Sequence, residues 1–256
     1  MAGERDRTPV DRSGTPAQGH LVPPAPSSRR PLRLQAVAPQ AIEWAADQLI
    51  AGDLVAFPTD TVYALGASLA HGASLRRLFS AKGRPPEKPL PVLLAAASDL
   101  DRIALALDPR VLTLVARYWP GPLTVVVPAR EGMPEEVVGP DRTVGARVPN
   151  HFLAVELIAK AGGALAATSA NRSGHPPASN ADDVERELGD RLDLLLDGGT
   201  APGGVPSTVV AFRGDELIVL REGAIPREHL AAAWAEVVGG AHAAGERASD
   251  APAPSG

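Results

Sequence analysis

The sequence contains no cysteine and few aromatic residues. The absence of cysteine excludes disulfide bonds, thiolate zinc sites, iron–sulfur clusters and a cysteine nucleophile. Aromatic residues make up 4% of the chain and apolar residues 45%, so a core must be built mainly from alanine, valine and leucine. The P-loop, the Rossmann glycine fingerprint and the GxSxG nucleophile elbow are also missing. Any nucleotide site in this chain must therefore be built in another way.

The charge and the histidines exclude further classes of protein. The formal net charge is −5, so the chain as a whole is not a polycation that binds nucleic acid, and any anion site must be local. The six histidines do not approach the spacing of HExxH or of another metal signature. No apolar run reaches the roughly 18 residues of a membrane span, and residues 1–31 lack the apolar stretch of a signal peptide. We expect a cytoplasmic protein without membrane contact.

Composition divides the chain into a core and two tails. Residues 1–31 are rich in proline, and residues 239–256 consist mostly of alanine, glycine, serine and proline. Neither segment has enough apolar surface to bury. We predict that both tails are disordered and that residues 32–238 form one folded domain.

Helical and strand patterns alternate through this domain. A helix is predicted over residues 42–50, with Gly52 as its C-terminal cap. A second, short helix includes residues 75–79 and ends near Gly83. Three further helices begin at the N-terminal caps Asp108, Asn150 and Asn180. Buried strands are predicted over 54–58, 90–95, 123–127, 143–148, 164–168 and 192–196, and a hairpin over 207–221. Mixed strands interleaved with helices predict an α/β fold, a mixed β-sheet with flanking helices.

A local basic segment lies within this acidic chain. Residues 71–90 hold five basic side chains and one acid, Glu87, which gives +5 − 1 = +4; the basic residues are Arg76, Arg77, Lys82, Arg84 and Lys88. Two of the three lysines of the chain are here, and an ammonium binds phosphate as a compact point charge. The other interpretation is a solvated helix end, at which Lys82 complements the helix dipole.

Small polar residues follow three of the predicted strand regions, at 58–61, 168–171 and 206–208. Hydroxyls, amides and backbone N–H groups at strand ends are typical ligand contacts in α/β proteins. Each segment alone is also explained by turn chemistry, since Ser, Thr, Asn and Asp favour caps and turns.

Seven motifs in order give the pattern a family resemblance. They are PTDTVYALG (58–66), KGRP with KPL (82–90), WPGPLT (119–124), TVGARVP (143–149), SAN (169–171), PSTVV (206–210) and REG (221–223). In this order they resemble the YrdC/Sua5 family of threonylcarbamoyl-adenylate synthases, over about residues 40–225. The chain is similar to the short, single-domain form of that family. It departs from the family at Ala64, where glycine is usual; the difference matters if that position needs a positive φ or lies against the ligand.

The resemblance implies a single YrdC-like domain, a twisted mixed sheet with a concave basic face that holds ATP and L-threonine. Carried over motif by motif, the ATP-binding residues are Lys82, Arg84, Thr143, Ser169, Asn171 and Arg221. Those for threonine are Thr59, Arg147, Ala167 through its backbone, and Ser207. Lys82 and Arg84 are expected at the phosphates as the catalytic cations, with both side chains at the ligand and not in the core. Mg²⁺ is expected on the phosphates of ATP.

The implied reaction joins two anions, so the site needs fixed positive charge. Threonine captures bicarbonate or CO₂ as a carbamate, whose oxygen attacks the α-phosphate of ATP and expels pyrophosphate. The adenylate would serve the threonylcarbamoyl modification of the adenosine beside the tRNA anticodon, after transfer to a separate threonylcarbamoyl transferase complex.

Two other functions agree with part of this pattern. A carbamoyltransferase of hydrogenase maturation contains a similar domain, but it also carries cysteine-rich zinc motifs that this chain lacks. A double-stranded RNA-binding module in tRNA or ribosome maturation fits the local basic charge. Retention of Thr59, Arg147 and Ser207 favours the enzyme, because an RNA-binding module has no use for an amino-acid pocket.

Overall fold

The computed structural model describes residues 31–36 and 40–249. The predicted N-terminal tail lies outside the described residues except for Pro31, and so do residues 250–256 of the C-terminal tail. The helices are α1 (Ala41–Ala51), α2 (Gly72–Lys82), α3 (Pro109–Tyr118), α4 (Phe152–Lys160), α5 (Ala181–Leu188) and α6 (Arg227–Ser249), with short 3₁₀ turns η1 (Ala97–Arg102), η2 (Pro140–Arg142) and η3 (Gly189–Arg191). In the part of the chain that the structure describes, no helix is both long and apolar enough to span a membrane.

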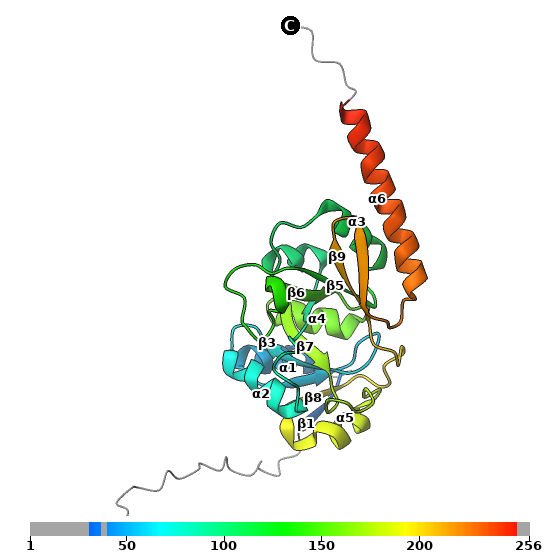
Figure 1. Ribbon diagram of the computed structural model, residues 1–256. Helices are drawn as coiled ribbons and strands as arrows, with labels where there is room; N and C mark the ends of the chain where they lie inside the picture. The colour runs from blue at the N-terminus through cyan, green and yellow to red at the C-terminus, as the bar shows by residue number, and fades with distance from the viewer. Residues whose placement is uncertain (1–30, 37–39, 250–256) are drawn as a thin grey trace, which may run out of the picture.

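The described strands form one mixed sheet of ten, in the order β1-β8-β2-β3-β7-β4-β6-β5-β9-β10 (Figure 1). Their bounds are β1 (Leu32–Gln35), β2 (Val55–Phe57), β3 (Ala64–Ser68), β4 (Val92–Leu94), β5 (Leu123–Pro128), β6 (Thr143–Arg147), β7 (Ala164–Ser169), β8 (Leu194–Asp197), β9 (Thr208–Arg213) and β10 (Glu216–Arg221). β1, β8 and β2 are parallel, whereas β2, β3, β7 and β4 pair antiparallel. The predicted mixed sheet with flanking helices is confirmed.

The sequence did not predict β1 or β3. β1 carries Arg33 and Gln35 at the edge of the sheet, and β3 is built from the small residues ALGAS. Neither segment has the run of branched apolar residues by which strands are found in a sequence. Both become strands because they pair with neighbours that are distant in the chain, Asp197 with Gln35 and Ser169 with Ala64 among them.

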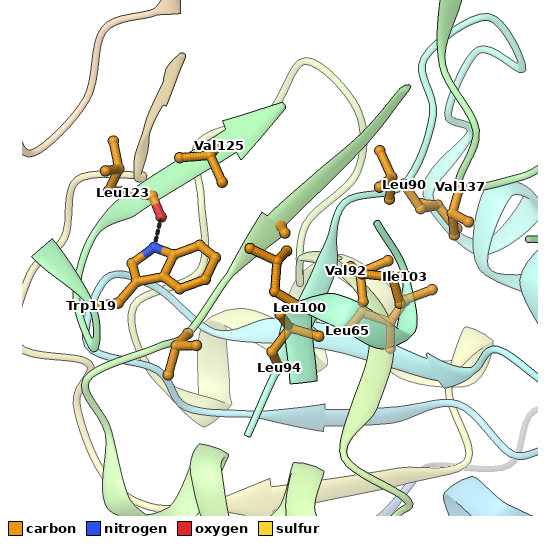
Figure 2. Close-up of a cluster of buried hydrophobic side chains, with 14 of the residues drawn as sticks. Leu65, Leu90, Val92, Leu94, Leu100, Ile103, Trp119, Leu123, Val125 and Val137 are labelled. Atoms are coloured by element: carbon orange, nitrogen blue, oxygen red, sulfur yellow. Dashed lines mark hydrogen bonds between the residues drawn. The ribbon is translucent and has the colours of Figure 1, made fainter. Parts of the chain in front are cut away.

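Alternation along the strands separates two apolar clusters. In β2, Ala56 belongs to the larger cluster, while Val55 and Phe57 belong to the smaller one with α1 and α4. Successive strand side chains point to opposite faces, so the two clusters lie on opposite faces of the sheet. Figure 2 shows part of the larger cluster, in which the indole of Trp119 donates a hydrogen bond to the carbonyl of Leu123 (2.7 Å).

The same alternation positions a functional site. Thr124 lies between Leu123 and Val125, which are both in the larger cluster. Ala167 follows Ala166 and Arg147 follows Ala146 in the same way. Thr124, Arg147 and Ala167 therefore lie on the opposite face, which α1 and α4 pack against through β2, β7 and β8.

Local capping agrees with most of the predicted helix ends. Gly52 ends α1 at φ 100°, a left-handed conformation that favours glycine. The side chains of Asp108 and Asn180 accept the expected N-cap hydrogen bonds at the starts of α3 and α5. The predicted cap Asn150 is wrong, because α4 begins one residue later and its cap position falls on His151, without a side-chain hydrogen bond. The start of this helix is set by packing of its buried face rather than by a local cap.

The C-terminal boundary also differs from the prediction. Helix α6 continues past Val238 to Ser249, where a disordered tail was predicted from Gly239, and Figure 1 shows it extending away from the domain. Its first half is anchored by the buried side chains of Leu230, Ala233, Trp234 and Val237. The extension contains three glycines, Gly239, Gly240 and Gly245, and the helix continues through them because each costs only about 1 kcal/mol relative to alanine.

Candidate functional site

Two adjoining pockets lie beside the sheet. The first, the Thr59 pocket, has a volume of ≈ 160 Å³ and is lined by the threonine-site residues of the sequence prediction: Thr59, Arg147, Ala167 and Ser207. The second, the Thr143 pocket, has a volume of ≈ 350 Å³ and includes Thr143. Both pockets share Arg84, Pro91, Thr124, Ser207 and Arg221, so these residues lie where the two meet. Segments far apart in the sequence are thus brought together.

Thr59 has both of the roles that the sequence suggests, a hydrogen bond within a turn and a place in a ligand pocket. Its hydroxyl donates to the carbonyl of Val62 (2.7 Å) and accepts from the N–H of Thr61 (3.2 Å), which closes the turn after β2. The same side chain, 2% exposed, lines the Thr59 pocket. The turn chemistry therefore fixes the position of a pocket residue.

Arg147 is held by residues of the motifs at 58–66 and 119–124. Its Nε donates to the carbonyl of Gly121 (2.9 Å), one Nη donates to the hydroxyl of Thr61 (2.9 Å), and the other forms an ion pair with Asp60. Burial lowers the pKa of the guanidinium, and the Asp60 carboxylate opposes that shift. Asp60, Thr61 and Gly121 were not predicted as site residues, yet they orient a cation in the pocket wall.

Ser207 belongs to a short chain of hydrogen bonds across two strands. Its hydroxyl lies 2.8 Å from that of Thr124, and Arg221 donates to its carbonyl (2.8 Å) and to its hydroxyl (3.2 Å). Thr124 is 5% exposed and lines both pockets. Thr124 belongs to the motif at 119–124, but no binding role was predicted for it from the sequence. A polar residue within the apolar run of β5 was the available signal.

Arg84 and Arg221 are cations held by carbonyl groups. Arg84 donates from Nε to the carbonyl of Lys88 (2.8 Å) and from one Nη to that of Pro89 (2.8 Å). Among the side chains that the structure describes, those of residues 31–36 and 40–242, neither arginine has a carboxylate within ion-pair distance. Burial lowers the pKa of both, and the charge of Arg221 lowers that of Arg84 further. Arg84 is partly buried and Arg221 is exposed, and two neighbouring cations without a carboxylate counterion favour an anion between them.

Lys82 is more buried than predicted. It is 3% exposed, lines neither pocket, and its ammonium donates to the carbonyls of Ser169 and Asn171. Burial and the charge of Arg84 lower its pKa to about 7, against the opposing charge of Glu187. The prediction that this side chain lies outside the core is therefore wrong, whereas its contact with the ligand stays a prediction. The segment that follows β7 folds over the end of α2, which no local pattern reveals.

Asn171 lies in that segment and also lines neither pocket. Its amide donates to the carbonyls of Arg172 (2.9 Å) and His175 (2.7 Å), which fixes the orientation of the group. Its Oδ1 is buried and has no hydrogen-bond partner among the described residues. Ser169, two residues earlier, does line the Thr59 pocket.

Ala64, the departure from the family pattern, lies in regular strand. It pairs with Phe57 and Ser169 in β3, and it is not among the described residues with positive φ. Its methyl group lines the Thr59 pocket beside Tyr63. A side chain at this position therefore strains no backbone and changes only the pocket wall.

Comparison with known families decides where this site belongs. The model of the Sua5/YciO/YrdC family, described as "Telomere recombination", matches residues 47–223, which include every predicted site residue. The chain belongs to the Sua5/YciO/YrdC family. The family resemblance inferred from the sequence is thus confirmed.

Relatives within the Sua5/YciO/YrdC family carry informative names. A threonylcarbamoyl-AMP synthase of Pyrococcus abyssi is 38% identical over 192 residues, covering 73% of this chain and 56% of that protein. A putative threonylcarbamoyl-AMP synthase of Mycobacterium tuberculosis is 35% identical over 181 residues, 71% of this chain and 83% of the relative. The crystal structure of P. abyssi Sua5 complexed with L-threonine superposes with a TM-score of 0.74 at 36% identity, covering 80% of this chain and 60% of that one. The chain spans about half the length of the Pyrococcus relative.

Proposed function

We propose that this protein is an L-threonylcarbamoyladenylate synthase, which makes L-threonylcarbamoyl-AMP and pyrophosphate from L-threonine, bicarbonate and ATP. The observation that carries the proposal is the pair Arg84 and Arg221, two cations that have no carboxylate partner among the described side chains and that lie where two pockets meet. A polyanion such as a triphosphate supplies the missing charge. The names of the relatives support the same reaction.

The Thr59 pocket is proposed for threonine and its carbamate. Arg147 offers its remaining N–H groups to the threonine carboxylate, and the hydroxyls of Thr59 and Ser207 offer hydrogen bonds to a polar ligand. The backbone of Ala167 lines the same pocket. A hydroxyl-matched site discriminates against valine because its polar groups are left unpaired when the ligand hydroxyl is missing.

The Thr143 pocket is proposed for the nucleotide, with the phosphates at Arg84 and Arg221. A carbamate oxygen then forms a bond to the α-phosphorus, and the bond from that phosphorus to the bridging oxygen of the β-phosphate breaks. The electron pair leaves with pyrophosphate. The two arginines stabilise the charge that moves onto the phosphate oxygens, so the step needs orientation and fixed charge but no covalent nucleophile.

Mg²⁺ is proposed as the ion that accompanies ATP. Among the described residues, no group of three or more His, Asp and Glu side chains could hold a metal, so the ion would be bound mainly by the phosphates. The buried, unpartnered Oδ1 of Asn171 fits this ion, because hard cations take amide oxygens as ligands. When bound, the ion would neutralise phosphate charge.

The product is proposed to serve tRNA modification, through a separate threonylcarbamoyl transferase complex that attaches the group to adenosine.

The alternative function, a double-stranded RNA-binding module, depends on a diffuse basic surface. In the structure the basic segment divides into different environments: Arg76 has a side chain that is 70% exposed and lies 3.5 Å from Glu136, whereas Arg84 lies in the pockets. These two arginines therefore provide a matched comparison.

The test is incubation with ATP, L-threonine and bicarbonate, with threonylcarbamoyl-AMP and pyrophosphate measured by mass spectrometry. Arg84→Ala should reduce product formation on the order of 10²-fold, as for loss of a preorganised charge, while Arg76→Ala should behave like the parent. Absence of product from the wild-type protein contradicts the proposed reaction. Equal loss in both variants, with both folded, would favour RNA binding by a diffuse patch.

A further inference from the structure

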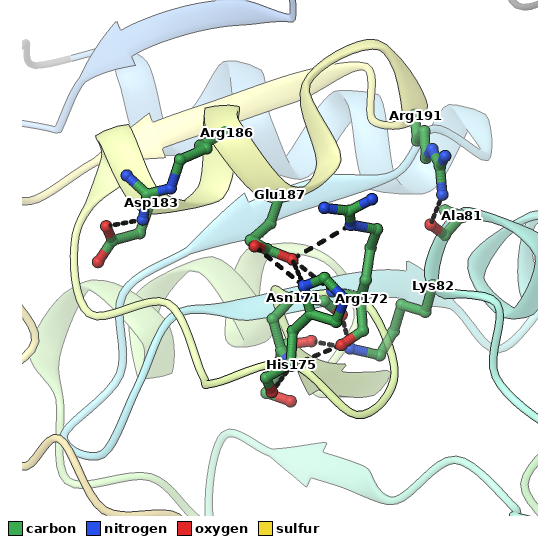
Figure 3. Close-up of polar contacts among 10 residues, drawn as sticks. Ala81, Lys82, Asn171, Arg172, His175, Asp183, Arg186, Glu187 and Arg191 are labelled. Atoms are coloured by element: carbon green, nitrogen blue, oxygen red, sulfur yellow. Dashed lines mark hydrogen bonds and ion pairs between the residues drawn. The ribbon is translucent and has the colours of Figure 1, made fainter.

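The loop between β7 and α5, residues 170–180, is held from two sides by charged groups. On the side of α2, the ammonium of Lys82 binds the carbonyls of Ser169 and Asn171, and the N–H of Ser173 donates to the carbonyl of Lys82 (2.8 Å). On the side of α5, Glu187 reaches the same loop (Figure 3). Ser169, the last residue of β7, and Asn171, the second residue of the loop, are two of the residues predicted for the nucleotide.

Glu187 collects three donors of the loop on one carboxylate. It accepts from the N–H of Arg172 (3.3 Å) and from the Nε of the same residue (3.4 Å), and the Nδ1 of His175 lies 3.0 Å away. Its side chain is 14% exposed, whereas those of Arg172 and His175 are 45% and 43% exposed. The acid is therefore the inner member of the cluster, and the loop residues close over it.

The two anchors hold neighbouring parts of the same segment. Lys82 binds the carbonyls of Ser169 and Asn171, and Glu187 binds Arg172 and His175. Removal of the acid would therefore release the part of the loop that directly follows Asn171.

We propose that Glu187 is a positioning residue for the nucleotide half of the site, which holds the 170–180 loop so that Ser169 and Asn171 meet the phosphates. This inference rests on the proposed function. Ser169 lines the Thr59 pocket, but none of the residues proposed for threonine lies in the 170–180 loop, so the main effect of Glu187 should be on ATP. Because it acts through Arg172 and His175, Glu187 itself touches no substrate.

The test compares Glu187→Gln with Glu185→Gln in the full-length protein. Glutamine at position 187 keeps the shape of the side chain but replaces one carboxylate oxygen by an NH₂ group. That group cannot accept the hydrogen bonds that Arg172 and His175 donate. Glu185 is two residues away on α5, and its carboxylate lies 3.6 Å from Arg33, away from the loop. We expect Glu187→Gln to raise the KM for ATP on the order of 10-fold, since an ångström-scale misplacement costs up to about 10²-fold. The KM for threonine should stay unchanged, and Glu185→Gln should match the parent.

A general structural role gives a different result. Partial unfolding lowers the amount of active enzyme, so kcat falls while both KM values stay the same; that outcome, or unchanged kinetics, overturns the inference. An inactive wild-type protein in the same assay would instead count against the proposed function. Should Glu187→Gln fail to fold, His175→Ala removes one exposed arm of the anchor and must raise the KM for ATP in the same direction. An unchanged KM for ATP in that variant overturns the inference.

Discussion

The ion pair between Arg147 and Asp60 allows a prediction about the stability of the domain. The two side chains are 7% and 12% exposed, so the pair is nearly removed from water. Asp60→Asn keeps the shape of the carboxylate but leaves the guanidinium buried without its counter-charge. Removing one partner of a buried pair typically costs about 3–5 kcal/mol. Hydrogen bonds from Arg147 to Thr61 and Gly121 remain, so we expect the lower end, about 3 kcal/mol.

The loss can be measured by urea denaturation and by thermal melting. At about 3 °C per kcal/mol for a domain of this size, the melting temperature should fall by roughly 10 °C. The control is Glu43→Gln, which breaks the exposed pair with Lys160 (3.2 Å) and should cost less than about 1 kcal/mol.

A double-mutant cycle checks the cause. Arg147→Met in the Asp60→Asn background should restore much of the lost stability, because it removes the unpaired charge. The reasoning is refuted if Asp60→Asn is as stable as the parent, or if the two substitutions add without coupling.

Three further predictions concern other groups. Thr124→Val should leave the fold nearly intact but reduce adenylate synthesis, measured by pyrophosphate release, because the hydroxyl of Ser207 loses one of its two partners and keeps only Arg221. Asn180→Ala should lower the free energy of unfolding by about 1 kcal/mol in urea, since α5 loses its N-cap. Lys82 has a folded-state pKa of about 7, below the 10.5 of the unfolded chain, so the unfolded state binds more protons between these values. Stability relative to Lys82→Met should therefore rise from pH 7 to about pH 10 and be lost as the pH falls through 7; a flat difference would contradict this.

Several local features could be read directly from the sequence. The end of α1 at Gly52 and the starts of α3 and α5 follow from residues that satisfy backbone groups within a few positions. The β9–β10 hairpin follows from two apolar runs that flank Gly214, which has φ 57°. The prediction of a tail from Gly239 is wrong because α6, which is anchored by its buried first half, continues through three glycines to Ser249.

For the candidate site, too, part could be predicted from the sequence and part required the tertiary structure. The order of the motifs determined the family and named the residues that line the two pockets, Thr59, Arg84, Ser207 and Arg221 among them. The sequence could not place a side chain relative to segments far away in the chain. Only the tertiary structure decided that Lys82 is buried on the carbonyls of Ser169 and Asn171, 87 and 89 residues away. Local capping and turns depend on neighbours along the chain, whereas burial and the partners of a charge depend on which segments the sheet brings together.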